Sequence, residues 1–260
     1  MCKVSVITIA YNAEKYIEET MLSVIAQKYN DFEYIIKDGG SSDDTNNIVQ
    51  DVKKRYDKKN IIRHITTRDK GIYSAMNEAA NYASGEWVVF MNAGDTFYDQ
   101  NVLLNIFSRQ YDNEIGVLYG HVLWKLTGNR GFVQTYNENT MKKGGSLCHQ
   151  SVLEKRELLI QKPFDINLKI LADREHFLQL QSDGIKFQRI NMIVAKEDRN
   201  GISSVNYPQF YREATIISDR YNLKYKRKNI LIGRIKMFIK MFIPQIEEVA
   251  MIRNALKKID

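Results

Sequence analysis

The first hundred residues alternate between short apolar runs, typical of buried strands, and longer stretches with apolar residues at helical spacing. This alternation implies βαβ crossovers and a largely parallel sheet. Loops that follow the carboxyl ends of such strands lie together at one edge, where open α/β sheets bind ligands. The predicted strands are residues 3–10, 32–37, 61–66 and 87–91, and the predicted helices are about 13–27, a helix capped by Ser41 or Ser42, and one ending near 83.

The second half of the chain has a different order of predicted elements. Strands are predicted at 117–126 and 131–136, followed by a loop at 141–150, a helix at 172–182 and a strand at 186–194. We expect this half to be α+β and to cover the open edge of the sheet.

The predicted sheet edge collects several carboxylates, among them Asp38, Asp69 and Asp95. Nearby glycines let the backbone approach a ligand closely, and hydroxyls and amides can contact ribose or phosphate. Asp95 ends a short turn directly after the apolar run 87–91, and a carboxylate in such a turn suits Mg²⁺ or Mn²⁺ held against a diphosphate. Each loop alone is also ordinary turn chemistry, so the interpretation depends on the loops sharing one edge.

Three stretches resemble the family 2 glycosyltransferases, which are inverting, nucleotide-sugar-dependent enzymes with the GT-A fold. Residues 5–12 resemble the family's opening strand, and residues 38–45 its D-G-S-x-D-x-T loop with Gly40 inserted or substituted. Residues 69–77 resemble its D-x-G-x-x-x-A-x-N segment. The resemblance covers roughly residues 3–205 and implies an α/β fold: a GT-A type nucleotide-binding sheet, mostly parallel with helices on both faces, a mixed α+β acceptor half and a C-terminal helical tail.

The resemblance implies a nucleotide site built from the first half. Asp38 and Asp69 are expected at the base, where their acceptor oxygens suit the imide N–H of uracil or thymine and favour a UDP- or dTDP-sugar. Tyr11 is expected near the base, and Asn77 is expected to orient the sugar or a loop. Arg199 lies in a stretch that resembles the loop closing over the donor, where it meets phosphate or forms a plain surface turn.

The family's usual Asp-x-Asp-Asp motif is replaced here by Asn92-Ala93-Gly94-Asp95, which places the chain in a subgroup with that variant. Asp95 aligns with the last acid and is therefore the expected metal ligand. Asn92 is expected to hydrogen-bond sugar hydroxyls or a metal-bound water. With fewer acids, metal affinity should fall, and the diphosphate must supply more of the ligands.

The catalytic base is expected in the second half, where residues 171–178 resemble the family's E-D-x-D-L helix start and Asp173 takes the base position. An inverting transfer needs one carboxylate to accept the proton of the acceptor hydroxyl. A helix N-cap or first-turn acid is the alternative role of Asp173. Glu175 is the reserve base, and His149 and Gln150 are acceptor-side candidates that face acceptor or diphosphate, unless the histidine is structural.

The net charge of +7 belongs to one segment. Between residues 221 and 243 there are seven basic residues and no acid, which leaves 31 basic against 31 acidic residues elsewhere. A nucleic-acid-binding surface is therefore not expected. The stretch 224–243 suits an interfacial membrane helix, or a helix packed on the catalytic domain or a partner subunit.

The expected organisation is a nucleotide-sugar half at 1–100, an acceptor and catalytic half of the same domain at 101–220, and a basic helical tail at 221–260. The two cysteines lack metal or redox spacing, and no signal peptide or membrane-spanning run is recognisable. We therefore expect a cytoplasmic protein, peripheral at the inner face of the membrane.

The expected activity is that of a hexosyl- or N-acetylhexosaminyl-transferase that extends a lipid-linked bacterial surface glycan. Two alternatives stay open. A sugar nucleotidyltransferase would need a glycine-rich, basic triphosphate loop after the first strand, where residues 11–14 are Tyr-Asn-Ala-Glu. A sugar-nucleotide-binding scaffold docked on a membrane would account for the depleted acidic motif and the basic tail without turnover.

Overall fold

A computed structural model describes residues 2–58, 60–125, 131–143, 145–197 and 206–223. Two sequence predictions lie outside these residues: Arg199 and the helical tail at 224–243.

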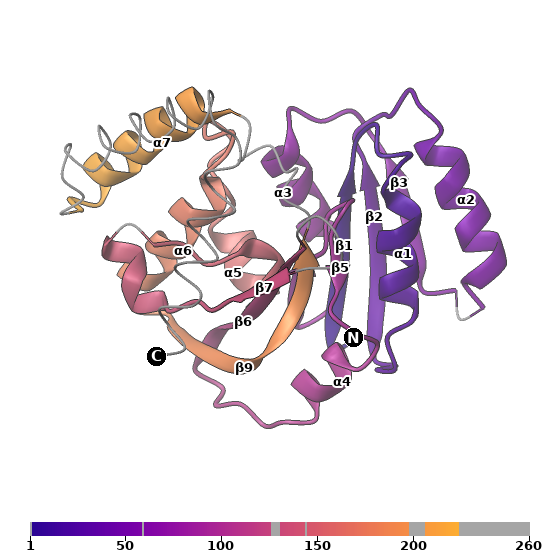
Figure 1. The fold of residues 1–260 in the computed structure, drawn as a ribbon, viewed down its shortest axis with the longest axis horizontal. Coiled ribbons are helices and arrows are strands. Elements are labelled where there is room, and N and C mark those ends of the chain that lie inside the picture. The colour runs from indigo at the N-terminus through magenta and orange to yellow at the C-terminus, as the bar shows by residue number, and fades with distance from the viewer. Residues whose placement is uncertain (1, 59, 126–130, 144, 198–205, 224–260) are drawn as a thin grey trace.

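One sheet runs through both halves of the described chain (Figure 1). Its order is β3-β2-β1-β4-β8-β6-β9-β5, with β7 beside β6. The first four strands are mutually parallel, whereas β8 runs antiparallel between β4 and β6. The strands are β1 (Val4–Ala10), β2 (Phe32–Asp38), β3 (Ile62–Thr66), β4 (Trp87–Phe90), β5 (Thr96–Phe97), β6 (Ile115–Lys125), β7 (Gly131–Gln134), β8 (Val152–Lys155) and β9 (Lys186–Glu197).

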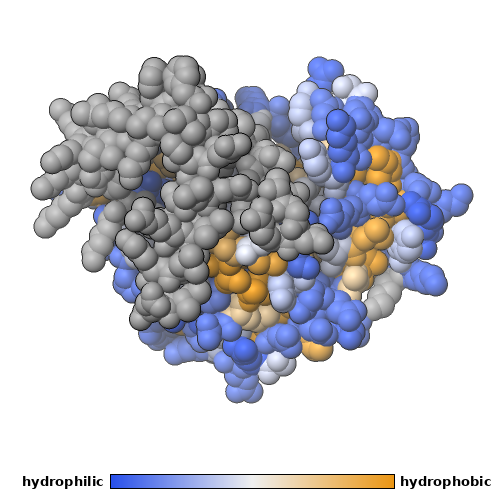
Figure 2. Space-filling view, viewed as in Figure 1, coloured by the Kyte–Doolittle hydropathy of each residue, from blue (hydrophilic) through white to orange (hydrophobic). Residues whose placement is uncertain are grey.

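Helices cover both faces of this sheet. Successive strand residues point to opposite faces, so Ile7 and Ile9 pack with α3, α5 and α6, while Val4 and Val6 pack with α1, α2 and α4. The helices are α1 (Ile17–Ile25), α2 (Thr45–Tyr56), α3 (Ile72–Tyr82), α4 (Val102–Phe107), α5 (Arg156–Gln161), α6 (Ala172–Ser182) and α7 (Tyr207–Arg220), with 3₁₀ turns η1 (Glu138–Lys143) and η2 (His149–Ser151). Where the described surface is visible in Figure 2, it is mostly hydrophilic, with hydrophobic residues in small groups.

The predicted serine cap of α2 is wrong. The helix begins at Thr45 with Asp44 in the N-cap position. The Ser41 hydroxyl instead donates to the Asp38 carboxylate and accepts a hydrogen bond from the Asn12 N–H. Ser41 therefore belongs to the loop before the helix, which its hydroxyl ties to Asp38 and Asn12.

The loops that follow the strands remain hydrogen-bonded to neighbouring strand ends at the carboxyl edge of the sheet. The Gly39 N–H donates to the Ala10 carbonyl at 2.9 Å, and the Thr67 N–H to the Asp38 carbonyl at 3.1 Å. The Ala93 N–H donates to the Ile9 carbonyl at 3.2 Å. Strand pairing therefore continues into the loops, so their side chains gather at one edge as predicted.

Candidate functional site

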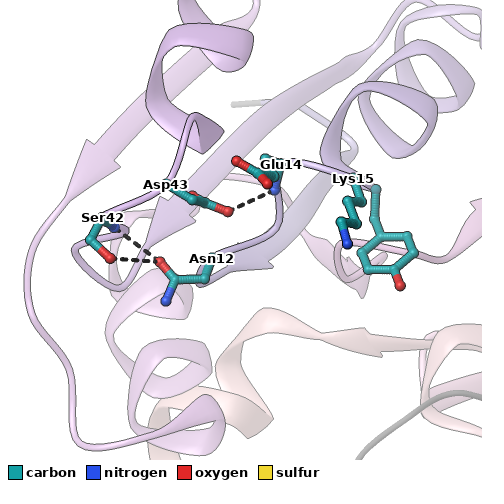
Figure 3. A pocket seen from close by; sticks show the side chains of 6 residues that line it. Asn12, Glu14, Lys15, Ser42 and Asp43 are labelled. Atoms are coloured by element: carbon teal, nitrogen blue, oxygen red, sulfur yellow. Dashed lines mark hydrogen bonds between the residues drawn. The ribbon is translucent and has the colours of Figure 1, made fainter.

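The loops after β1 and β2 are tied together by side-chain hydrogen bonds. The Ser42 N–H donates to the Asn12 side-chain carbonyl at 2.9 Å, and the Glu14 N–H donates to the Asp43 carboxylate at 3.0 Å (Figure 3). Asn12 has a φ of 48°, a left-handed conformation that asparagine tolerates better than most residues. The two loops therefore form one rigid wall beside a cavity of about 470 Å³, which is lined by Asn12, Glu14, Lys15, Tyr16, Ser42 and Asp43.

Asp38 serves its own loop. Its side chain is fully buried, and its carboxylate accepts hydrogen bonds from the Gly40 N–H at 3.0 Å and the Ser41 N–H at 2.9 Å. The Ser41 hydroxyl and the Asn46 amide also donate to it. Because the Asp38 carboxylate is buried and bound to these partners, it stabilises the conformation of its own loop in this structure.

Tyr11 and Asp69 lie close together above that loop. A Cβ atom placed on Gly39 would stand 2.5 Å from Asp69 Oδ2 and 3.3 Å from Tyr11 Cδ2. The Tyr11 side chain is 65% exposed, so its ring is available to a ligand. Asp69 Oδ1 accepts a hydrogen bond from the Gly71 N–H at 2.9 Å. The structure thus brings together two of the three residues predicted at or near the base, Tyr11 and Asp69 but not the enclosed Asp38, and Gly39 leaves the space between them.

The turn that carries Asp95 is held by α1. Gly94 has a φ of +105°, which favours glycine, and the Asp95 N–H donates to the Asn92 carbonyl at 2.9 Å. The buried Thr20 hydroxyl accepts from the Gly94 N–H at 3.0 Å and donates to the Asp95 carbonyl at 2.8 Å. Nothing in the sequence singles out Thr20, because it occupies an ordinary inward position of an amphipathic helix.

Gln150 connects Asp95 to the second half of the chain. Its side-chain amide donates to Asp95 Oδ2 at 2.8 Å, and its carbonyl accepts from the Cys148 thiol at 3.2 Å. The same thiol contacts the buried Glu197 carboxylate at the end of β9. Burial raises the pKa of Glu197 to about 7, and the charge of Asp173 contributes to that rise. The sequence prediction missed Glu197 because it ended that strand at residue 194.

The acceptors around the turn fit a cation that arrives with a diphosphate. The side-chain oxygen of Asn92 is buried with no hydrogen-bond partner among the described residues. Among all the residues that the structure describes, no three His, Cys, Asp or Glu side chains are grouped to hold a metal ion. Mg²⁺ commonly binds through one or two carboxylates together with substrate phosphates. One carboxylate and a nearby amide oxygen match that mode, and they do not make a closed protein cage.

Asp173 lies at the start of α6, next to a tyrosine from the first half. Leu171, and not Asp173, occupies the N-cap position, so the capping half of the alternative role is wrong, whereas Asp173 does lie in the first turn of α6. The Tyr73 hydroxyl lies 3.1 Å from Asp173 Oδ1 and 2.8 Å from the Ile170 carbonyl, so its one hydrogen is shared between these two acceptors. Burial raises the pKa of Asp173 above its ordinary value, and hydrogen bonds from the Arg174 backbone and Tyr73 oppose the rise. A partly exposed carboxylate with a raised pKa is suited to accept a proton.

Two other predicted residues bind protein groups. The buried Glu175 carboxylate accepts from Arg220 at 2.6 Å and from the Tyr221 hydroxyl at 2.7 Å. Glu175 therefore holds the end of α7 against α6, a structural role that differs from its predicted role as reserve base. The side-chain amide of Asn77 makes two 2.9 Å hydrogen bonds with the Phe164 backbone, so it orients a loop.

His149 is a structural residue. Its ring packs against those of Phe90, Phe164 and Phe177, with centroids 5.0, 5.5 and 6.0 Å away. Burial lowers the pKa of His149 to about 3, with His176 adding to the effect, so the imidazole is neutral. Of the two neighbouring candidates His149 and Gln150, it is Gln150 whose side chain reaches the sheet edge.

Comparison with known proteins finds relatives of one enzyme class. The family profile described as Glycosyl transferase family 2 matches residues 5–177. The chain is 28% identical over 228 residues to the Escherichia coli UDP-Glc:alpha-D-GlcNAc-diphosphoundecaprenol beta-1,3-glucosyltransferase WfgD, covering 83% of this chain and 85% of that enzyme.

Two solved structures are similar to this one. Residues 1–349 of S. aureus TarS, in complex with UDP-GlcNAc, have a TM-score of 0.69 at 20% identity, covering 88% of this chain and 69% of that fragment. Glucosyl-3-phosphoglycerate synthase from Mycobacterium tuberculosis, in complex with Mn²⁺, UDP and glucosyl-3-phosphoglycerate, has a TM-score of 0.57 at 16% identity, covering 84% of this chain and 79% of the synthase. These likenesses show a shared fold, and the predicted GT-A type architecture is confirmed.

Proposed function

Because the chain belongs to glycosyl transferase family 2, we propose that it is an inverting enzyme that transfers a hexose or N-acetylhexosamine from a UDP- or dTDP-sugar to a glycan hydroxyl. That it is a glycosyltransferase of glycan synthesis follows from its family and from its named relatives. The Gln150–Asp95 hydrogen bond carries the finer proposal, since it joins the acidic turn of the first half to the half that holds Asp173. The halves at 1–100 and 101–220 then serve donor and acceptor, respectively.

The donor base binds between Tyr11 and Asp69. Asp69 offers acceptor oxygens for the imide N–H of uracil, and Tyr11 offers an exposed ring for stacking. Asp38 acts on the base through the loop that it holds. The UDP-Glc donor named for the similar WfgD supports a uridine nucleotide.

A divalent cation, Mg²⁺ or Mn²⁺, would be held by Asp95, with Asn92 and the donor diphosphate nearby. When bound, it would neutralise the charge that develops on the departing diphosphate. The Mn²⁺ and UDP in the similar synthase support this assignment. The Asn-Ala-Gly-Asp turn defines the subgroup in this proposal, because one protein carboxylate leaves more of the coordination to the diphosphate.

Asp173 is the general base. Its carboxylate accepts the proton of the acceptor hydroxyl as that oxygen attacks the anomeric carbon, and Tyr73 orients it. Transfer to a hydroxyl with inversion needs this single carboxylate and no covalent intermediate. Arg199 would contact the diphosphate from the closing loop.

The acceptor is proposed to be a lipid-linked bacterial glycan, like the diphosphoundecaprenol-linked acceptor in the name of the similar enzyme WfgD. The basic segment 224–243 would place the enzyme at the inner face of the membrane by attraction to anionic headgroups. Within the described residues, no helix combines the length and the apolar character needed to cross a bilayer.

UDP release from a panel of UDP-sugars, with Mn²⁺ and then with EDTA, tests the proposal on lipid-linked acceptors. Metal-dependent release that is lost in Asp95→Ala and Asp173→Asn supports it. Nucleotide binding without turnover on any acceptor would contradict it and favour the scaffold alternative.

A further inference from the structure

Lys37 is a fully buried lysine directly before Asp38 on β2. Lysine is almost never buried unless its charge is paired. Its ammonium donates to the Thr67 carbonyl at 2.6 Å and to the Asp38 carbonyl at 3.3 Å. It also lies 3.5 Å from carboxylate oxygens of Asp69 and Glu78. These partners satisfy an ammonium group that has three donors and no acceptor.

The contacts place one positive charge under both nucleotide-facing loops. The Asp38 carbonyl begins the loop after β2, and the Thr67 carbonyl begins the loop after β3 that carries Asp69. The Asp69 side chain is only 13% exposed, so neighbouring groups cover most of it. The Lys37 ammonium, 3.5 Å away, helps to fix where this carboxylate lies, and its oxygens are hydrogen-bond acceptors.

We infer that Lys37 is a positioning residue that holds the Asp69 carboxylate in place as an acceptor for the imide N–H of uracil, and thereby sets the base class of the donor. The inference deepens the proposed function and rests on it. Uracil carries a hydrogen on N3, whereas the N3 of cytosine is an acceptor that a carboxylate repels. Lys37 therefore contributes to discrimination between UDP and CDP without touching either nucleotide.

The test measures the affinities of the full-length protein for UDP and CDP by calorimetry in the presence of Mg²⁺. Lys37→Met keeps the length of the side chain and removes its charge. We expect it to weaken UDP binding about tenfold, the scale of one hydrogen bond to a charged group, and to weaken CDP binding less. In an Asp69→Asn background, the same substitution should add no further loss.

Glu78→Gln is the matched control, because it removes the other carboxylate beside Lys37 but leaves Asp69 in place. It should keep UDP affinity within about twofold. Lys37→Met leaves two acids without their cation, so folding is checked by circular dichroism. If the single variant does not fold, the cycle is measured in the Glu78→Gln background, where only one acid loses its partner.

If Lys37→Met weakens UDP and CDP binding equally, the inference is overturned and Lys37 is a structural residue. The same holds if Lys37→Met weakens UDP binding equally in the wild-type and Asp69→Asn backgrounds. Failure of the wild-type protein to bind UDP would overturn the proposed donor, and the inference with it. The two failures are therefore distinguished by the wild-type titration alone.

Discussion

The side-chain amide of Gln150 donates a 2.8 Å hydrogen bond to the carboxylate of Asp95. The two residues lie in different halves of the chain, Gln150 in η2 and Asp95 in the turn after β4. A carboxylate only accepts hydrogen bonds, so the NH₂ group of Gln150 faces Asp95, and its carbonyl lies 3.2 Å from the Cys148 thiol. Gln150 therefore fixes the acid that the proposed metal requires.

Gln150→Leu should weaken metal binding without removing a metal ligand. Loss of a residue that orients a ligand typically costs ten- to a hundredfold in metal affinity, so we expect a rise of about tenfold in the Mn²⁺ concentration for half-maximal UDP release. Paramagnetic resonance of Mn²⁺ with UDP present gives a second measure that does not depend on turnover. Gln110→Leu, at an exposed position, is the control. An unchanged Mn²⁺ requirement would contradict the role of Gln150.

Asp173→Asn should lower transfer by about 10²- to 10⁴-fold, because the amide cannot accept the acceptor's proton. UDP affinity should remain close to wild type, which separates a catalytic loss from a folding loss. Glu175→Gln, on the same helix, should retain transfer, since Glu175 binds Arg220 and Tyr221. Transfer that survives Asp173→Asn but not Glu175→Gln would reverse the assignment of the base.

Transfer should fall on the acidic side as Asp173 becomes protonated. Its folded-state pKa lies above the ordinary value, so activity is present above that raised pKa and is lost as the pH drops through it. The Tyr73 hydrogen bond lowers the pKa of Asp173, and therefore Tyr73→Phe should move the acidic limb to higher pH. The pH profile of kcat/KM measures this shift. A shift to lower pH would be inconsistent with the hydrogen bond.

Thr20→Val should destabilise the Asp95 turn. The valine keeps the shape of threonine but leaves the Gly94 N–H and the Asp95 carbonyl without their shared partner. We expect the free energy of unfolding to fall by about 1–3 kcal/mol in urea titrations. Thr215→Val is the control, since within the described residues the Thr215 hydroxyl bonds to the carbonyl one helical turn earlier. Equal losses in both variants would argue against a special role for Thr20.

Much of the fold was predictable from local patterns. The strands β1 to β4 and the helix α6 lie within a few residues of their predicted positions, because apolar periodicity reports burial along a single element. The short elements β5, α4, β8 and α5 were missed, and so was the longer helix α7. The short elements have two or three buried residues each, too few to show a period of their own, and β5 and β8 form against strands that are distant in the chain.

The sequence by itself determined the alternation of strands and helices and the edge at which Asp38, Asp69 and Asp95 gather, since both follow from local hydrophobic spacing and strand direction. Only the tertiary structure decided what each acid does. Asp38 is enclosed by its own loop, Glu175 is bound by α7, and Asp173 stands beside Tyr73. These outcomes depend on hydrogen-bond partners and burial supplied by other segments, and a linear pattern does not contain that information.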